Sequence, residues 1–354
     1  MSAPDTPAPY APQPLDAAEG HGNPPSQAAP ESTTRRGLLD KLTARLTGLY
    51  DAREARSIAL IALAELAGLP LSALLTDPGA PMAADGFEAM AAQLAAGRPV
   101  QYAVGHTEFY GHRFAVREGV LIPRPETEEL VAAAAAEAVA GTAALDVGTG
   151  SGCIAVSLAR LIPDARVTAV DLSPQALAVA RRNAVRLGAE VRFVQADALA
   201  GLHELPDAAF DLIVSNPPYV PQSDRAAMHV NVRDYEPPEA LFVPDDDPLR
   251  FYRAIGRAAR RLLRPDGRLW FEIYEQLADE TRGCSPTKGS ATSPCDATST
   301  TNREYYAVRQ ENKRGAPHQD TGTGARCADA PLRPRRTLGG GRTPADDALG
   351  RSTG

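Results

Sequence analysis

The amino-acid sequence predicts an α/β protein in which a doubly wound, mainly parallel sheet follows a small N-terminal helical domain. Between residues 143 and 273, short apolar runs of strand length alternate with longer segments of helical period. Such alternation places helices between the parallel strands of one sheet. Before this block, residues 35–98 show the helical period alone, with apolar side chains recurring at steps of three and four. A chain of 354 residues is long enough for both domains.

The first segment of the chain differs from both domains in composition. Residues 1–34 are rich in Pro, Ala and Ser and have almost no large apolar side chains. They cannot offset the entropy of ordering, so we expect disorder. The segment lacks the basic start and apolar core of a signal peptide. Because no stretch of the chain approaches the roughly 20 apolar residues of a membrane span, we expect a cytoplasmic protein without a membrane partner.

The helical domain and the linker after it are separated by a change of period. Leucines from Leu38 to Leu49 recur at helical spacing, and Gly68-Leu69-Pro70 and Asp77-Pro78-Gly79 interrupt the pattern. A domain of this kind holds a partner by default. Within residues 99–123 the period shortens around Gly111, so a β-hairpin that joins the two domains is expected from Val100 to Ile122.

Residues 124–282 should form the sheet domain. Its first helix is expected from Pro125 to about Ala140, because Pro suits the first helical turn and Glu126 and Glu128 complement the helix dipole. Ser173 is a suitable N-cap for a later helix. The predicted strands are 143–147, 166–170, 190–194, 210–215 and 268–273, and the predicted helices are 153–161, 174–187 and 248–263, the last followed by a turn at Pro265-Asp266-Gly267.

The last segment, residues 283–354, contains too few large apolar side chains for a core, so we expect it to be disordered. It carries 11 Lys and Arg against 7 Asp and Glu, although the net charge of the whole chain is −7. The rest of the protein is therefore acidic. An acidic body argues against direct binding of nucleic acid, whose non-specific affinity depends on Lys and Arg.

A glycine-rich loop and two acids follow the first three predicted strands. Asp146-Val147 leads into Gly148-Thr149-Gly150-Ser151-Gly152, where glycines permit positive φ and a close approach of the backbone to a ligand. Asp171, after the second strand, is placed to accept hydrogen bonds from both hydroxyls of a ribose. Asp197, after the third, is placed to accept one from an adenine amino group. The pattern favours a nucleoside without phosphates over a dinucleotide, since the loop offers no second phosphate-binding feature.

A stiff polar loop, Asn216-Pro217-Pro218-Tyr219, follows the predicted strand 210–215. Two prolines fix φ near −65° and donate no backbone hydrogen bonds, so the loop is rigid and rich in acceptors. The carboxamide of Asn216 and the carbonyl of Pro217 can each accept one N–H of an amide or amine, and Tyr219 offers a flat face for stacking. Ligands of open α/β sheets bind at this end of the strands.

Together these motifs resemble those of class I S-adenosylmethionine-dependent methyltransferases, and Asn-Pro-Pro-Tyr is typical of the branch that methylates nitrogen on planar groups. With Glu108-Phe109-Tyr110-Gly111 and Leu121 to Glu128, the chain is similar to the bacterial release-factor glutamine methyltransferase family over residues 36 to 280. The resemblance implies a Rossmann-like catalytic domain and an enzyme that methylates the glutamine of the Gly-Gly-Gln loop in peptide-chain release factors.

The resemblance also implies the roles of individual residues. Asn216, Pro217 and Tyr219 would be catalytic, and with Pro218 would hold the substrate glutamine. S-adenosylmethionine would bind at Gly148, Thr149, Gly150, Ser151, Gly152, Asp171, Asp197, Ala198 and Asn216. The expected partner is a release factor, the expected oligomeric state is a monomer, and Arg124 and Glu126 brace either the two domains or the cofactor pocket.

Two features depart from this family. Ala198-Leu199 stands where the family often has an aromatic residue that packs on the adenine. The family also ends in a helix and an antiparallel strand pair, and the composition after Arg282 provides neither, so we expect the last strands to be missing. Residues 283–354 look like a frame-shifted or replaced terminus, and the strand 268–273 would then have an exposed edge.

Other readings of the sequence stay open. A nucleic-acid adenine or guanine methyltransferase uses the same tetrapeptide on a flipped base, and a non-catalytic chain could keep the helical domain as a binding module. We predict no metal. The four cysteines, Cys153, Cys284, Cys295 and Cys327, lack the spacing of a metal site or a disulfide framework. A metal site formed in the tail by Cys284, Cys295, Cys327 and His318 would have irregular spacing. Hydrolytic chemistry is not supported, because no nucleophile or carboxylate pair accompanies the histidines; these are His106, His112 and His229.

Overall fold

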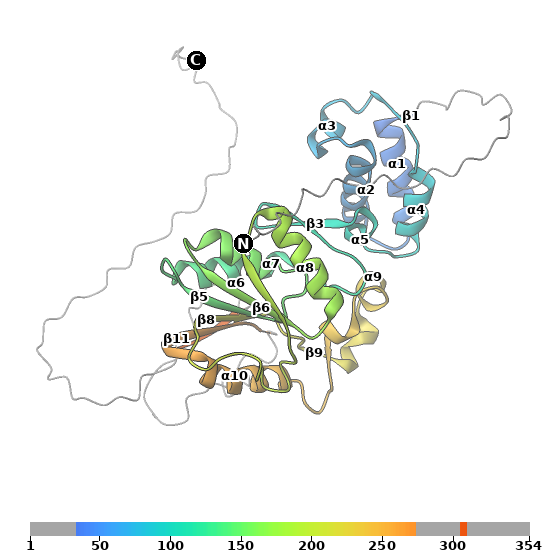
Figure 1. The fold of residues 1–354 in the computed structure, drawn as a ribbon. Coiled ribbons are helices and arrows are strands. Elements are labelled where there is room, and N and C mark those ends of the chain that lie inside the picture. The colour runs from blue at the N-terminus through green and yellow to red at the C-terminus, as the bar shows by residue number, and fades with distance from the viewer. Residues whose placement is uncertain (1–32, 274–304, 310–354) are drawn as a thin grey trace, which may run out of the picture. The chain divides into compact units, whose positions relative to one another are not determined.

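The computed structural model describes residues 33–273 and 305–309 of the chain (Figure 1). The predictions of disorder for residues 1–32, and for most of 283–354, lie outside the described residues. Thr33–Thr34, placed in the disordered segment by the sequence analysis, instead forms a short strand, β1, antiparallel to β2 at Pro81–Met82. The Thr34 side chain also caps the first helix by accepting from the backbone N–H of Gly37.

The N-terminal domain is helical, as predicted. Its helices pack their leucine, isoleucine and alanine side chains into one buried cluster that includes Leu42, Leu46 and Leu63. Asp51 caps the second helix, and Gly68 ends it in the left-handed conformation, which glycine adopts without steric cost. The helices are α1 Arg35–Leu46, α2 Ala52–Ala67, α3 Leu71–Thr76, α4 Phe87–Ala95 and α5 Val100–Val104.

The predicted hairpin is shorter than the sequence indicated. Val100–Val104 forms helix α5, and the hairpin comprises β3 His106–Phe109 and β4 His112–Ala115. Tyr110 and Gly111 form its turn with φ of 49° and 72°, the positive values that favoured two-residue hairpin turns require. Val100 is buried in the helical cluster, so its apolar period reflects packing in that domain and not a strand.

The second domain contains a six-stranded sheet of order β12-β11-β8-β5-β6-β7. The strands β11, β8, β5, β6 and β7 are parallel, and β12 pairs antiparallel with β11. The predicted doubly wound sheet is confirmed. The strands are β5 Ala143–Val147, β6 Arg166–Asp171, β7 Val191–Gln195, β8 Phe210–Ser215, β11 Leu263–Glu272 and β12 Tyr305–Arg309.

Helices cover both faces of this sheet (Figure 1). Alternate residues along the strands face opposite sides: Leu212 and Val214 pack with α6 and α7, whereas Ile213 packs with α10. This two-sided burial explains the nearly continuous apolar runs in the sequence. The helices are α6 Pro125–Ala136, α7 Cys153–Leu161, α8 Pro174–Leu187 and α10 Arg250–Leu262.

Two predictions about the end of the sheet are wrong. Pro265-Asp266-Gly267 is not a turn before the strand but lies within β11, where the pairing with β8 shifts register between Leu263 and Arg268. The prediction of an unpaired edge at β11 is also wrong, because Tyr305–Arg309 pairs with Arg268–Glu272 and covers that edge. Five residues with two tyrosines and a valine suffice for an edge strand even where composition cannot supply a core.

The loop after β8 is long and contains short elements of its own. Two-residue strands β9 Val220–Pro221 and β10 Phe242–Val243 pair in parallel. Between them lie 3₁₀ helices at Gln222–Ala227 and Pro238–Ala240 and helix α9 Val230–Arg233. Over residues 33–273 and 305–309, none of the helices has the length and apolar character needed to cross a bilayer.

Candidate active site

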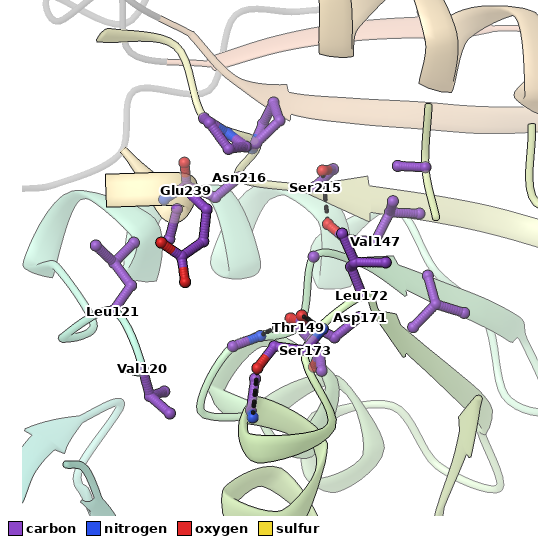
Figure 2. A pocket seen from close by; sticks show the side chains of 18 of the residues that line it. Val120, Leu121, Val147, Thr149, Asp171, Leu172, Ser173, Ser215, Asn216 and Glu239 are labelled. Carbon is purple, nitrogen blue, oxygen red and sulfur yellow. Dashed lines mark hydrogen bonds between the residues drawn. The ribbon is translucent and has the colours of Figure 1, made fainter. Parts of the chain in front are cut away.

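The loops after β5, β6, β7 and β8 open into one cavity of about 450 Å³ at the carboxyl ends of the strands. Figure 2 shows Asp171 and Ser173 on one side of this cavity and Asn216 and Glu239 on the other. The structure therefore brings together two motifs that the sequence placed on separate strands. Of the predicted site residues, those that line the cavity are Gly148, Thr149, Gly150, Ser151, Asp171, Asp197, Ala198, Asn216, Pro217 and Pro218.

The glycine loop has the conformation that its sequence predicts. Gly148, Gly150 and Gly152 have φ of 77°, 54° and 82°, in the region that favours glycine. Gly152 does not line the cavity. A Cβ added to it would lie 3.1 Å from Cα of Ala180, so this glycine permits α7 and α8 to pack closely.

Asp171 ties the loops after β5 and β6 together. Its Oδ2 accepts from the backbone N–H of Gly150 and its Oδ1 from that of Ser173, both at 2.8 Å. Burial raises the pKa of this carboxyl, although the backbone hydrogen bonds oppose the shift. Each carboxylate oxygen has two lone pairs, so both retain capacity for ribose hydroxyls. That role remains a prediction.

Asp146 is a buried acid whose part in the site the sequence analysis did not assign. It is fully buried, and its Oδ2 accepts from the Thr149 hydroxyl at 2.6 Å and the backbone N–H of Ala155 at 3.1 Å. Its Oδ1 has no hydrogen-bond partner among the described residues. Burial raises the pKa of Asp146 to about 7. Its position directly before the glycine loop was the available signal.

The loop after β7 contributes a third wall to the cavity. Asp197 Oδ1 accepts from the backbone N–H of Leu199 at 2.8 Å, which orders the turn. Asp197, Ala198 and Leu199 all line the cavity. The predicted contact between Asp197 and an adenine amino group is geometrically open, and it stays a prediction.

Hydrogen bonds to neighbouring elements hold the Asn-Pro-Pro-Tyr loop and the residue before it in place. Ser215, at the end of β8, donates to the carbonyl of Val147 at 2.7 Å and fixes where the loop leaves the sheet (Figure 2). Asn216 Nδ2 donates to the hydroxyl of Thr127 at 3.2 Å. Tyr219 is not among the residues that line the cavity; its ring packs against the core and its hydroxyl donates to Glu272 at 3.2 Å. Its stacking role stays a prediction that these contacts do not favour.

Glu272 is a second acid that sequence reasoning missed. It lies at the carboxyl end of β11 and is 4% exposed. Besides Tyr219, it accepts from the hydroxyl of Thr127 at 2.6 Å. Burial raises the pKa of Glu272, and the hydrogen bonds from Thr127, Tyr219 and Asn216 oppose the rise. A single acid at the end of an apolar strand is not a recognisable sequence motif. Only the fold therefore shows that Glu272 contacts the Asn-Pro-Pro-Tyr loop.

Arg124 braces the cavity, one of the two roles that the sequence allowed. Its guanidinium donates at 2.5 Å to Glu236, whose other oxygen accepts from the backbone N–H of Ile122 at 3.2 Å. Arg124 lines the cavity, and Glu236 is buried in the long loop after β8. In the same loop, Tyr235 donates to the carbonyl of Ala96 at 2.9 Å. The loop therefore contacts the helical domain as well as the site.

No group of three or more His, Cys, Asp or Glu side chains fit to bind a metal occurs within residues 33–273 and 305–309. The irregular set of Cys284, Cys295, Cys327 and His318 lies outside these residues, and Cys153 is buried. The chemistry available at the cavity is that of hydrogen-bond acceptors and backbone N–H groups. Groups of this kind can accept hydrogen bonds from a polar planar group and donate hydrogen bonds to it.

A doubly wound sheet with a glycine loop after its first strand, acids after the next two and Asn-Pro-Pro-Tyr after the fourth defines a class I methyltransferase, the class that takes its methyl group from S-adenosylmethionine. In agreement, residues 144–235 match the family model described as a methyltransferase domain. The chain belongs to the release factor glutamine methyltransferase family, because the relative from Geobacter sulfurreducens is 41% identical over 256 residues, 72% of this chain and 89% of its own length.

Other relatives agree. The release factor glutamine methyltransferase of Bacteroides thetaiotaomicron is 50% identical over 182 residues, 51% of this chain and 65% of that protein, which is just under two thirds of its length. Among solved structures, TrmN from Thermus thermophilus aligns over 48% of this chain and 42% of its own length, with 28% identity and a TM-score of 0.35. That score is too low to add to the assignment.

Proposed function

We propose that this protein transfers a methyl group from S-adenosylmethionine to the side-chain amide nitrogen of the glutamine in the Gly-Gly-Gln loop of peptide-chain release factors. The observation that supports it best is the position of Asn216 and Pro217, which form one wall of the same cavity as the glycine loop and Asp171. An amide acceptor site and a nucleoside site thus share one space.

The residues of the cavity fit S-adenosylmethionine. The backbone of Gly148 to Gly150 leaves room beside the loop, since a Cβ at Gly148 or Gly150 would meet nothing within 4 Å. We assign Asp171 to the ribose hydroxyls and the loop Asp197 to Leu199 to the adenine, and the lining of the cavity by all of these residues supports the assignment. The Oδ1 of Asp146, which has no hydrogen-bond partner among the described residues, offers a buried acceptor close to the glycine loop. When bound, the cofactor supplies an electrophilic methyl group on a sulfonium.

The chain's own contribution to the reaction is orientation. An amide nitrogen is a poor nucleophile because its lone pair is delocalised. Hydrogen bonds from its two N–H groups to the Asn216 carboxamide and the Pro217 carbonyl would direct that lone pair at the methyl group. Correct positioning of reactants can supply roughly 7 to 11 kcal/mol at best. No strong base is needed, because the N-protonated product is acidic enough to lose its proton to water or to Asn216.

The release factor is the proposed protein partner, with no direct contact to nucleic acid, and the protein acts as a cytoplasmic monomer. The helical domain is the proposed region that holds the release factor. Contacts of the loop after β8 with this domain support that role, since Tyr235 donates to Ala96 and His229 contacts the carbonyl of Leu49 at 3.0 Å. A partner bound to the helices would thereby lie against the loop that forms one wall of the cavity.

Incubation with labelled S-adenosylmethionine tests the proposal. The full chain is given a release factor, the same release factor with its Gly-Gly-Gln glutamine replaced by alanine, or DNA. We expect label in the first sample only. Label in DNA but not in the release factor would favour the nucleic-acid alternative, and absence of both label and cofactor binding would favour a non-catalytic chain.

A further inference from the structure

Three side chains form a relay of hydrogen bonds beneath the Asn-Pro-Pro-Tyr loop. We propose that Glu272 is a positioning residue which, directly and through Thr127, fixes the end of the Asn216 carboxamide that faces the cavity and makes the site selective for an amide over a carboxylate. This inference rests on the proposed function. It adds a specificity mechanism and assigns roles to two residues outside the Asn-Pro-Pro-Tyr loop.

The relay joins three elements that are distant in the chain. Thr127, in the first turn of α6, donates to Glu272 Oε2 at 2.6 Å, and Asn216 Nδ2 donates to Thr127 Oγ1 at 3.2 Å. Thr127 and Glu272 are 2% and 4% exposed, so water does not compete freely for these bonds. Asn216 is half-buried and lines the cavity.

The direction of each hydrogen bond follows from the inventory of donors. An ionised carboxylate only accepts, and a threonine hydroxyl has one hydrogen. The distance of 2.6 Å between Thr127 and Glu272 lies in the range of an O–H donor to a carboxylate. Once Thr127 has given its hydrogen to Glu272, its oxygen can only accept. Of the two ends of Asn216, only the Nδ2 end can donate to it.

The second carboxylate oxygen of Glu272 also accepts a hydrogen bond, which supports the same direction of donation toward Glu272. Tyr219 donates to Oε1 at 3.2 Å, so both oxygens accept from hydroxyl groups. The charge of Glu126 raises the pKa of Glu272, and the Asn216 side chain also hydrogen-bonds to this carboxylate. Arg124 lowers the pKa of Tyr219. The stable arrangement is an acceptor at the centre, with the two hydroxyl groups and the Asn216 amide as donors around it.

The selectivity for an amide over a carboxylate follows from the Asn216 atom that is left to face the cavity. With Nδ2 committed to Thr127 and Glu272, Asn216 presents Oδ1 to the cavity beside the Pro217 carbonyl, which is also an acceptor. A glutamine amide can donate one N–H to each. A glutamate carboxylate would place its lone pairs against two acceptors and have no hydrogen to share. Without the relay, the carboxamide can rotate by half a turn, present Nδ2 and accept the carboxylate.

The matched pair Thr127→Val and Thr127→Ser tests this. Valine keeps the shape and removes the hydroxyl, whereas serine keeps the hydroxyl. Binding of the full chain to a release factor is measured with the native Gly-Gly-Gln and with a Gly-Gly-Glu version, in the presence of S-adenosylhomocysteine. We expect the native protein and Thr127→Ser to prefer glutamine at least tenfold, and Thr127→Val to lose most of that preference. Thr168→Val is the control, since Thr168 is buried in β6 and outside the relay.

A full preference for glutamine in Thr127→Val would overturn the inference. Glu272→Gln supplies a second, isosteric variant: its amide can donate to Thr127 and reverse the relay, so the preference should fall there too. Unchanged cofactor affinity shows that each variant is folded.

Failure of the proposed function is a different outcome, in which the native protein binds neither release factor. The relay can still be measured by NMR. The side-chain amide hydrogens of Asn216 should exchange slowly in the native protein and in Thr127→Ser, and at least tenfold faster in Thr127→Val. Equal exchange in all three would overturn the relay itself.

Discussion

Arg124 and Glu236 form an ion pair at 2.5 Å although 112 positions separate them. Arg124 precedes α6, and Glu236 lies in the loop after β8, so the pair holds two walls of the cavity together. The Glu236 side chain is 1% exposed and that of Arg124 34%. Loss of the Arg124 charge would therefore leave the Glu236 carboxylate buried and unpaired, which is unfavourable.

Removal of Arg124 should destabilise the fold. Arg124→Met leaves the Glu236 carboxylate buried with only a backbone donor, and loss of one partner of a buried pair costs up to about 3 kcal/mol here, toward the lower end of the usual range because Arg124 is partly exposed. The double variant with Glu236→Gln should recover part of the loss. Urea unfolding measures both. Glu88→Gln, in an exposed pair with Lys41, is the control and should change little.

Substitution of Asp171 should weaken cofactor binding. Asp171→Ala removes the proposed ribose acceptor and two backbone anchors, at Gly150 and Ser173. Hydrogen bonds to a charged group contribute roughly 1.5 to 3 kcal/mol each, so affinity for S-adenosylmethionine should fall at least tenfold by calorimetry. Asp85→Ala, at an exposed position of the helical domain, should leave it unchanged. An affinity equal to that of the native protein would refute the assignment of Asp171.

Loss of the Asn216 side chain should lower turnover without a comparable loss of affinity for S-adenosylmethionine. Asn216→Ala removes an orienting acceptor, and we expect turnover to fall about 100-fold, comparable to removal of one group that stabilises a transition state. Cofactor affinity should stay nearly intact. If affinity and turnover fall in parallel, Asn216 belongs to the cofactor pocket and the proposed amide contact is wrong.

Stability should depend on pH through Asp146. Its pKa is raised to about 7 by burial, above the ordinary value near 3.9 of an exposed Asp. The folded state therefore binds more protons than the unfolded state between these values, and stability falls as pH rises through this window. In Asp146→Asn that group no longer titrates. The stability difference between native protein and variant should thus shift against the native protein from pH 4 to pH 7, as measured by urea unfolding at each pH; a constant difference would contradict the pKa.

The edge strand β12 should matter for solubility. A chain that ends at residue 304 lacks the partner of Arg268–Glu272 in β11, and an unpaired strand edge is a template for association. We expect more oligomer by size-exclusion chromatography and unchanged affinity for S-adenosylmethionine. A chain that ends after Arg309 is the matched control and should behave as the full protein. Monomeric behaviour of the shorter chain would show that β12 does not protect the edge.

Local features of the sheet domain could be predicted from the sequence. The bounds of β5, β8, α7 and α8 agree with the predicted ranges, and Ser173 caps α8 as expected. Each depends on signals within a few residues: apolar period, a capping side chain, or a glycine where φ is positive. The tetrapeptide and the glycine loop could also be recognised from local sequence. Their meeting in one site could be predicted because a parallel sheet brings the carboxyl ends of its strands to one edge.

Contacts between distant residues were decided by the tertiary structure alone. Thr127 and Glu272 are 145 positions apart, and neither belongs to the glycine loop or to the Asn-Pro-Pro-Tyr loop. The same holds for Glu236, which reads as an ordinary loop acid until the fold buries it against Arg124. Strand β12 formed where composition predicted none, because an edge strand needs only one neighbour and few apolar side chains. The sequence by itself determined most strands and helices of the parallel sheet and which motifs meet. Burial and long-range pairing decided the edge strand β12 and which polar side chains hold those motifs in place.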